Sequence, residues 1–231
     1  MSMVPKDYLR FIMAVTRAVE LGEIQIERIE EAVRRILRVK FELGSFEHPQ
    51  SDPDLLASVG SSEHRELARE AVAKSLVLLK NENQALPLSK SLPKLLVAGQ
   101  HANDIGLQCG GWTIEWQGKP GPVTLGTTIL EAIRTVVSAS TEVVFDQLGE
   151  FADRSDAGGG SAVAPVGLAV VGEMPYAEGF GDSADLRLSQ VDRMIIERLR
   201  QCCIKLVVVV ISGRPLILTK QLPLMDALVA A

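Results

Sequence analysis

Hydrophobic residues recur at helical spacing in two stretches near the amino end of the chain. Asp7–Leu21 and Glu27–Leu43 place apolar residues three and four positions apart, and each stretch is followed directly by a glycine, Gly22 or Gly44. This pattern predicts two amphipathic helices that end at glycine caps. Residues 1–45 therefore form a helical pair whose apolar faces need a surface that the chain does not obviously supply.

The next stretch is rich in prolines and small polar residues. Residues 46–61 include His48-Pro49 and Asp52-Pro53, which predict a linker. Ser62 then caps a helix that is predicted to run to about Leu79, followed by a turn-rich connection up to residue 94. We therefore expect a second domain over residues 62–231.

Short apolar runs alternate with helical patterns in the rest of the chain. The expected strands cover residues 95–98, 142–145, 167–171, 206–211 and 227–230, and the expected helices cover 127–137 and 189–202. This alternation is typical of a mostly parallel sheet covered by helices on both faces, so the fold class is α/β, a three-layer α/β/α sandwich. The glycine run within Asp153–Ser161 predicts a surface loop.

The chemistry-bearing stretch follows the third expected strand. The loop Gly172–Asp182 carries two glutamates five positions apart, Glu173 and Glu178. A loop at the carboxyl end of a strand is where open α/β sheets place ligands, and a carboxylate in a cleft can transfer protons. The alternative is that these acids are solvated turn formers, which is common in glycine-rich loops.

Both tryptophans of the chain lie in a second glycine-framed loop. Trp112 and Trp116 stand in the stretch Cys109–Gly118, although aromatic residues make up only 4% of the sequence. Flat apolar rings so close together suggest a platform for the apolar face of a sugar ring. The alternative is that one or both tryptophans cover the domain core.

Composition narrows the function further. The chain has a formal net charge of −5 and no basic cluster, so nucleic acid is not an expected partner. Its three cysteines fit neither a disulfide framework nor a zinc pattern, and Cys109 has no histidine in a recognisable partner motif. The longest apolar run, Leu206–Ser212, is too short to cross a membrane. We expect no metal and no cofactor.

Several motifs, taken in order, resemble glycoside hydrolase family 3, most closely its β-glucosidase and β-glucan exohydrolase branch. The resemblance covers nearly the whole chain and is weakest between about residues 147 and 165. It is carried by Met1-Ser2-Met3-Val4-Pro5, Arg35-Ile36-Leu37-Arg38-Val39-Lys40-Phe41, Leu67-Ala68-Arg69-Glu70-Ala71, Leu78-Leu79-Lys80-Asn81, Gly110-Gly111-Trp112 to Trp116, Gly172-Glu173-Met174-Pro175-Tyr176-Ala177-Glu178 and Ile211-Ser212-Gly213-Arg214-Pro215.

The resemblance implies an amino-terminal (β/α)8 barrel followed by an α/β sandwich domain, with the active site between them. It implies retaining, exo-acting hydrolysis of β-glucosides or β-glucan oligosaccharides, in which the barrel supplies an Asp nucleophile. The position that matches the acid/base glutamate is Glu178, not Glu173. Trp116 matches an aromatic of the leaving-group subsite, to which we add Trp112 from the platform, and Met3 matches a barrel residue near the bound sugar.

The chain also departs from the family pattern. A Ser-Asp-Trp nucleophile motif is absent from the sequence. Residues 1–45 would then be the helical end of a barrel, the remainder an incomplete sandwich, and the barrel a missing partner. We expect the chain alone to be inactive. The family resemblance suggests a secreted or periplasmic location.

Two other classes of function compete with this interpretation. A nucleotide-binding α/β domain is disfavoured, because Gly118-Lys119 is followed by Pro120 instead of the Ser or Thr of a phosphate-binding loop. A non-catalytic carbohydrate-binding or interaction module remains open, since binding through Trp112 and Trp116 needs less of a site than turnover does. For Glu173, we expect a structural role as a hydrogen-bond acceptor, and for Arg214 a bridging charge.

Overall fold

The computed structural model describes residues 2–151 and 163–231, so the predicted loop Asp153–Ser161 lies outside the described residues. The chain divides into two compact units, Met1–Arg69 and Glu70–Ala231. This division falls within a helix and not within the predicted linker at 46–61, and the domain boundaries given above stay predictions. Each unit is described by itself.

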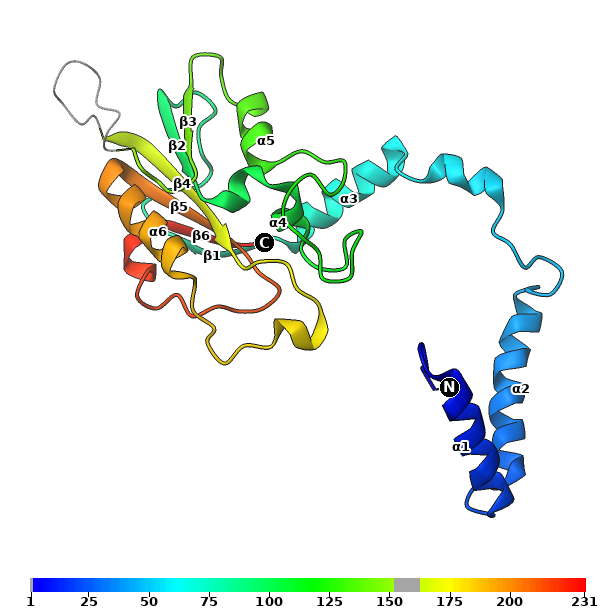
Figure 1. The fold of residues 1–231 in the computed structure, drawn as a ribbon. Coiled ribbons are helices and arrows are strands. Elements are labelled where there is room, and N and C mark those ends of the chain that lie inside the picture. The colour runs from blue at the N-terminus through cyan, green and yellow to red at the C-terminus, as the bar shows by residue number, and fades with distance from the viewer. Residues whose placement is uncertain (1, 152–162) are drawn as a thin grey trace. The chain divides into compact units, whose positions relative to one another are not determined.

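The first unit is helical. Its helices α1 (Tyr8–Glu20) and α2 (Ile26–Glu42) agree with the predicted pair, and a 3-10 turn, η1 (Pro53–Ser58), lies in the proline-rich stretch (Figure 1). The Asp7 carboxylate accepts a hydrogen bond from the Arg10 N–H at 3.3 Å and so caps α1. Neither α1 nor α2 contains a buried residue.

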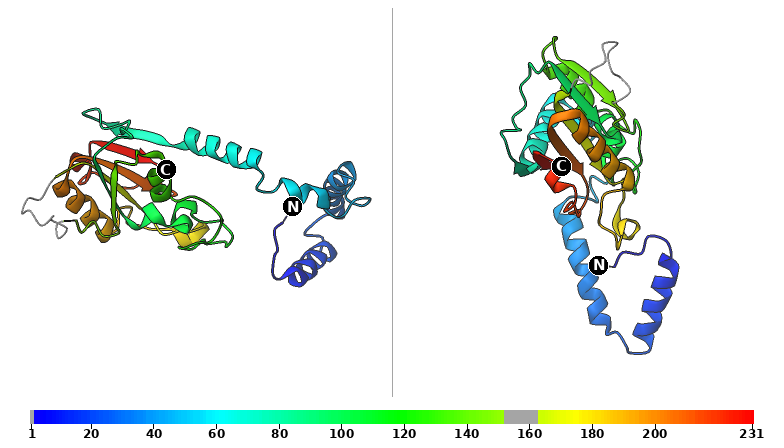
Figure 2. Two further views of the ribbon diagram at one scale, coloured as in Figure 1. Left: turned by 90° about the horizontal axis from the view of Figure 1, so that it is seen from above. Right: turned by 90° about the vertical axis from the view of Figure 1, so that its left-hand side faces the viewer.

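The second unit is built on a six-stranded sheet with strand order β1-β6-β5-β4-β2-β3 (Figure 1 and Figure 2). All neighbours are parallel except β1 and β6, which are antiparallel. The predicted α/β class is therefore confirmed. The strands are β1 (Val77–Asn81), β2 (Lys94–Ala98), β3 (Glu142–Asp146), β4 (Ala164–Gly172), β5 (Cys203–Ile211) and β6 (Ala227–Ala230).

Strand β1 corrects one prediction. The helix expected to reach Leu79 ends earlier, since α3 spans Ser62–Ser75 and the backbone from Val77 pairs with β6. The Lys80 ammonium, on β1, donates to the carbonyl oxygens of Leu222 at 3.0 Å and Met225 at 2.6 Å. Pairing with a distant segment thus overrides the local helical preference of this stretch.

Helices cover the two faces of the sheet. Helix α6 (Gln190–Cys202) packs Ile195, Ile196 and Leu199 against one face, whereas α5 (Ile129–Val136) places Leu130 on the other. Successive strand residues alternate between these two cores, as the pleat requires. Both helices begin at capping residues, because the hydroxyls of Thr128 and Ser189 accept from the backbone N–H groups of Glu131 and Asp192.

The carboxyl ends of the parallel strands meet at one edge of the sheet. The chain moves from β2 to β3 in one direction and from β4 to β5 and β6 in the other, so the strand order reverses between β2 and β4. A Cβ on Gly99, after β2, would lie 2.0 Å from the Val170 carbonyl oxygen, so only glycine fits there. This reversal point is where open α/β sheets bind ligands.

Candidate active site

Glu173 follows β4 at this edge, and its carboxylate accepts hydrogen bonds from three side chains. The donors are the Tyr176 hydroxyl at 3.1 Å, the Ser212 hydroxyl at 2.5 Å and the Arg214 Nε–H at 3.0 Å. The carboxylate therefore joins the segment after β5 to the loop after β4. It is a structural acceptor in the described residues, which is the role expected of it from the sequence.

The charges around Glu173 favour its ionised form. Partial burial alone would raise the pKa of Glu173, but the hydrogen bonds from Arg214, Ser212 and Tyr176 and the Arg214 charge hold this pKa below its usual range. Burial and the hydrogen bond to Glu173 raise the pKa of Tyr176. The Arg214 guanidinium also lies 4.5 Å from the centre of the Tyr176 ring.

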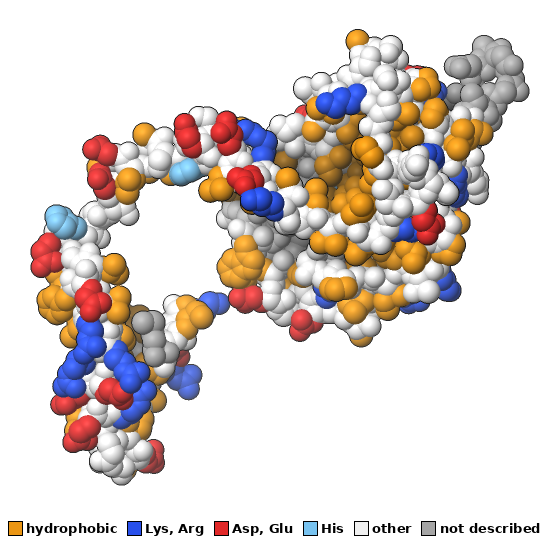
Figure 3. All heavy atoms as spheres, turned by 180° about the vertical axis from the view of Figure 1, so that it is seen from behind, with side chains coloured by type: hydrophobic (Ala, Val, Ile, Leu, Met, Phe, Trp, Pro, Cys, Tyr) orange, Lys and Arg blue, Asp and Glu red, His pale blue; other side chains and the backbone are white. Residues whose placement is uncertain are grey.

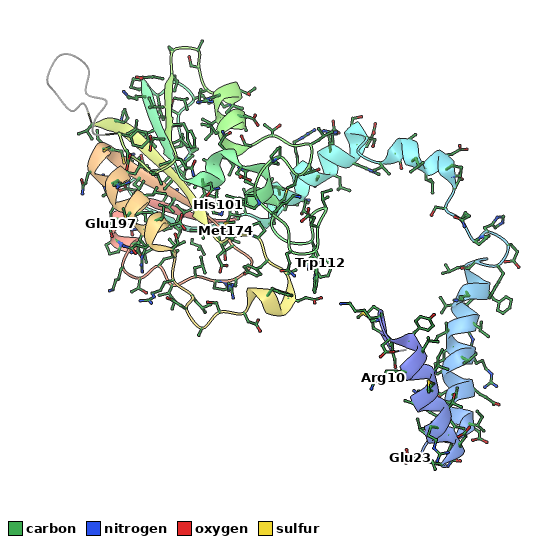
Figure 4. All side chains as sticks on the ribbon, in the orientation of Figure 1. Arg10, Glu23, His101, Trp112, Met174 and Glu197 are labelled. Atoms are coloured by element: carbon green, nitrogen blue, oxygen red, sulfur yellow. The ribbon has the colours of Figure 1, made fainter. Side chains whose placement is uncertain are left out.

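A buried histidine holds the backbone of the same loop. The His101 Nε2 atom lies 3.0 Å from the Glu173 carbonyl oxygen, and the residue is only 5% exposed. His101 and Met174 lie together at the end of β4 (Figure 4). Both line a cavity of about 610 Å³ together with Asp192, and burial raises the pKa of the Asp192 carboxyl. The loop is thus anchored, through the Glu173 carbonyl, to the 3-10 turn η2 (Gln100–Asn103) that follows β2.

Glu178 stands on a short turn farther along this loop. The preceding Ala177 is buried, and its N–H donates to the Gln117 Oε1 atom at 2.9 Å. Glu178 opens a 3-10 turn, η3 (Glu178–Gly181), with a φ of 52°, and its side chain is exposed. A non-glycine residue in the left-handed region costs on the order of 1–3 kcal/mol. Its neighbours therefore hold the Glu178 backbone in a strained conformation.

The loop Cys109–Gly118 (the tryptophan loop) and the loop Gly172–Asp182 (the acidic loop) pack directly on one another. A Cβ on Gly111 would lie 2.0 Å from the Tyr176 carbonyl oxygen, and one on Gly118 would lie 2.8 Å from the Pro175 Cβ. The glycines that frame the tryptophan loop are needed because the backbone of the acidic loop passes so close. The loops that carry Glu178 and the tryptophans are consequently direct neighbours.

The tryptophans face outward. Trp112 is 68% exposed and Trp116 is 49% exposed, with their ring centroids 6.3 Å apart (Figure 4 labels Trp112). The alternative that they cover the domain core is therefore wrong for this unit. A third exposed ring, Phe180, lies 5.7 Å from Trp116 with its plane at 82° to it. The sequence reading missed Phe180 and Gln117, because both act through contacts between the two loops.

A larger cavity adjoins the site. It measures about 1070 Å³, and Trp112 and Glu178 line it together with apolar sheet residues, among them Leu168, Val207 and Val209. Figure 3 shows hydrophobic side chains gathered over a recessed part of this unit. Glu178 therefore stands at the border of an apolar hollow and solvent.

Cys109 and Met3 are the remaining candidates from the sequence, and Cys109 lines the larger cavity. Partial burial raises the pKa of the Cys109 thiol, which disfavours the thiolate that nucleophilic catalysis requires. Met3 lies in the first unit with a side chain 90% exposed, and its contact with a sugar stays a prediction. Over residues 2–151 and 163–231, no group of three His, Cys, Asp or Glu side chains could hold a metal ion. Within the same residues, none of the helices combines the length and the apolar character of a membrane-spanning segment.

The fold and the paired loops define an α/β sandwich domain with a candidate site at the carboxyl edge of its sheet. Residues 76–231 match the model of the glycosyl hydrolase family 3 C-terminal domain. The chain belongs to glycoside hydrolase family 3.

Known glycosidases are similar to this chain over almost its full length. The lysosomal beta glucosidase of Dictyostelium discoideum is 30% identical over 244 residues, which cover 96% of this chain and 28% of that protein. The exo-1,3/1,4-beta-glucanase of a Pseudoalteromonas species is 37% identical with a TM-score of 0.84, over 99% of this chain and 28% of that one.

A third relative was solved with a sugar. A beta-glucosidase mutant from Listeria innocua, in complex with laminaribiose, is 25% identical with a TM-score of 0.73, over 93% of this chain and 29% of that one. The chain thus spans less than one third of the length of each of these relatives.

Proposed function

We propose that this chain carries the acid/base half of a retaining β-glycosidase site that acts on β-glucosides or β-glucan oligosaccharides. Glu178 is the acid/base residue, and Trp116 and Trp112 bind the leaving group. The observation that carries the proposal is the position of Glu178, exposed on a strained turn directly after residues that pack against the tryptophan loop. Strain of this kind collects at functional sites.

In this mechanism, a second carboxylate attacks the anomeric carbon while Glu178 gives its proton to the departing oxygen. The ionised Glu178 then removes a proton from water, and the resulting hydroxide displaces the sugar from the second carboxylate. The two carboxyl groups stand about 5–5.5 Å apart in retaining enzymes. Glu173 does not fill the second role in the proposal, because its oxygens are occupied by three donors.

We assign the second carboxylate to a barrel domain. The sequence contains no Ser-Asp-Trp motif, and the relatives are more than three times as long as this chain. The chain by itself is therefore expected to hydrolyse no glucoside. Measurable turnover of an aryl β-glucoside by the purified chain, abolished by Glu178→Gln, would contradict this assignment of the nucleophile.

A chimera tests the role of Glu178. The chain replaces the matching segment of the Pseudoalteromonas exo-glucanase, and Glu178→Gln is compared with Glu173→Gln. Loss of a general acid harms leaving groups of high pKa most, so Glu178→Gln should lose far more activity on phenyl than on 2,4-dinitrophenyl β-glucoside. Equal losses on both substrates would refute the acid/base role. Glu173→Gln should reduce both rates alike, through misplacement of the loop.

The exposure of both tryptophans also favours a second candidate, a non-catalytic carbohydrate-binding module. An intact chimera distinguishes the two. If the chimera binds laminaribiose but Glu178→Gln leaves its rates unchanged, the module is the correct interpretation.

A further inference from the structure

Phe180 is an exposed aromatic residue that adds little to the core of its unit. It lies two positions after Glu178 in the turn η3, within the loop drawn in yellow in Figure 1, and its side chain is 76% exposed. Burial does not explain a ring that leaves most of its surface in solvent. Its ring instead touches Trp116, at a centroid distance of 5.7 Å.

The backbone next to Phe180 is held in place despite this exposure. Gly181 is buried, and a Cβ there would lie 2.1 Å from the Tyr176 Cδ2 atom, so the chain rests on the Tyr176 ring. The Tyr176 hydroxyl in turn donates to Glu173. Phe180 is thereby presented to solvent from a braced turn, which lowers the entropy lost when a ligand binds.

We infer that Phe180 contacts the leaving group of the glycoside and selects leaving groups with an apolar rim. The inference rests on the proposed function, in which Trp116 binds the leaving group. The planes of Trp116 and Phe180 lie at 82°, so the two rings form two walls of a corner. A flat leaving group stacked on one wall presents its rim to the other.

The chemistry of that rim decides which leaving group fits. The rim of a glucosyl unit carries hydroxyl groups, which would lose water against the Phe180 ring without gaining a hydrogen bond. The rim of a phenyl group carries C–H bonds of partial positive charge, which suit the negative face of an aromatic ring. Phe180 should therefore favour an aryl over a glucosyl leaving group.

The test uses the whole chain labelled with ¹⁵N. Its two tryptophans give two indole N–H signals, both from the platform. Phenyl β-glucoside and laminaribiose are titrated separately against the parent chain and the Phe180→Ala and Phe180→Leu variants. Ile204→Ala is the matched control, because Ile204 is also exposed but lies near the amino end of β5, away from the site.

We expect both Phe180 variants to bind phenyl β-glucoside about 3- to 10-fold more weakly than the parent chain, which is the range for loss of one aromatic contact. The affinity of these variants for laminaribiose should change by less than about 2-fold. Ile204→Ala should leave the affinity for both ligands unchanged. Equal effects on the two ligands, or no effect on either, would overturn the role of Phe180.

Failure of the proposed function gives a different result. If neither ligand shifts an indole signal of the parent chain, or if Trp116→Ala leaves binding unchanged, then Trp116 is not a leaving-group platform and the proposed site is wrong. If Trp116→Ala abolishes binding of both ligands while Phe180→Ala does nothing, only the inference on Phe180 fails.

Discussion

Arg214 and Glu173 form an ion pair of 2.9 Å across the carboxyl ends of β5 and β4, with each side chain only 22% exposed. The pair holds together the two segments that leave adjacent parallel strands. Because Glu173 is the second residue of the loop Gly172–Asp182, this contact fixes the start of the chain's path toward Glu178. The stability of the ion pair and the geometry of the site are therefore linked.

Removing the cation should destabilise this unit. In Arg214→Leu the Glu173 carboxylate keeps two neutral donors but loses its charged partner, so we expect a loss of about 2 kcal/mol in the free energy of unfolding. Urea unfolding followed by tryptophan fluorescence measures it. The matched control is Arg187→Leu, whose exposed pair with Asp185 should contribute less than about 1 kcal/mol. Equal losses in both variants would contradict a special role for Arg214.

Glu173 should also make the free energy of unfolding depend on pH. Its pKa is lowered in the folded state, so the folded protein binds fewer protons than the unfolded chain and gains stability above the usual Glu pKa of about 4.3. That contribution is lost as the pH falls through the lowered value. Free energies of unfolding measured from pH 7 to pH 3 should fall less steeply in Glu173→Gln. An unchanged slope would show that the carboxylate is not stabilised by folding.

Asp192 should have the opposite effect. Burial raises the pKa of this carboxyl, so the folded state binds the proton more tightly, and stability falls as the pH rises from the usual Asp value of about 3.9 through the raised one. Asp192→Asn removes the ionisable group, and the amide oxygen can still accept from the Ser189 hydroxyl. The variant should lose this decline in stability. A steeper decline than in the parent chain would contradict the prediction.

Most helices and strands could be predicted from local sequence patterns, whereas the contacts between loops that build the candidate site could not. A helical pattern predicted α6 from Ser189, and apolar runs predicted β4 and β5. Strand β1 was missed because its pairing partner lies about 150 residues away. Glu173 could be expected to accept hydrogen bonds, but its donor Ser212 became visible only when β5 was placed beside β4. Phe180 was missed because Trp116 belongs to another loop.

The close approach of the two loops predicts a strong effect of a single methyl group. In Gly111→Ala the added Cβ meets the Tyr176 carbonyl oxygen at 2.0 Å, so the loops must move apart. Because the backbone is rigid on both sides, Gly111→Ala should lower the free energy of unfolding by at least about 2 kcal/mol. The indole N–H signals of both tryptophans should shift. Gly110→Ala is the control, because a Cβ there meets nothing within 4 Å and only the φ of +74° is strained.

Gln117 provides the last test, because its side chain is the only described acceptor for the N–H of Ala177, directly before Glu178. Gln117→Leu removes that acceptor and leaves a buried N–H without a partner, at a cost of about 1–3 kcal/mol. The strained φ of Glu178 should then relax, since less of its surroundings holds it in place. Amide hydrogen exchange at Ala177 should accelerate by about tenfold or more, while exchange in β4 stays unchanged. Unaltered exchange at Ala177 would show that the turn is held by the Tyr176 and Gly181 contact alone.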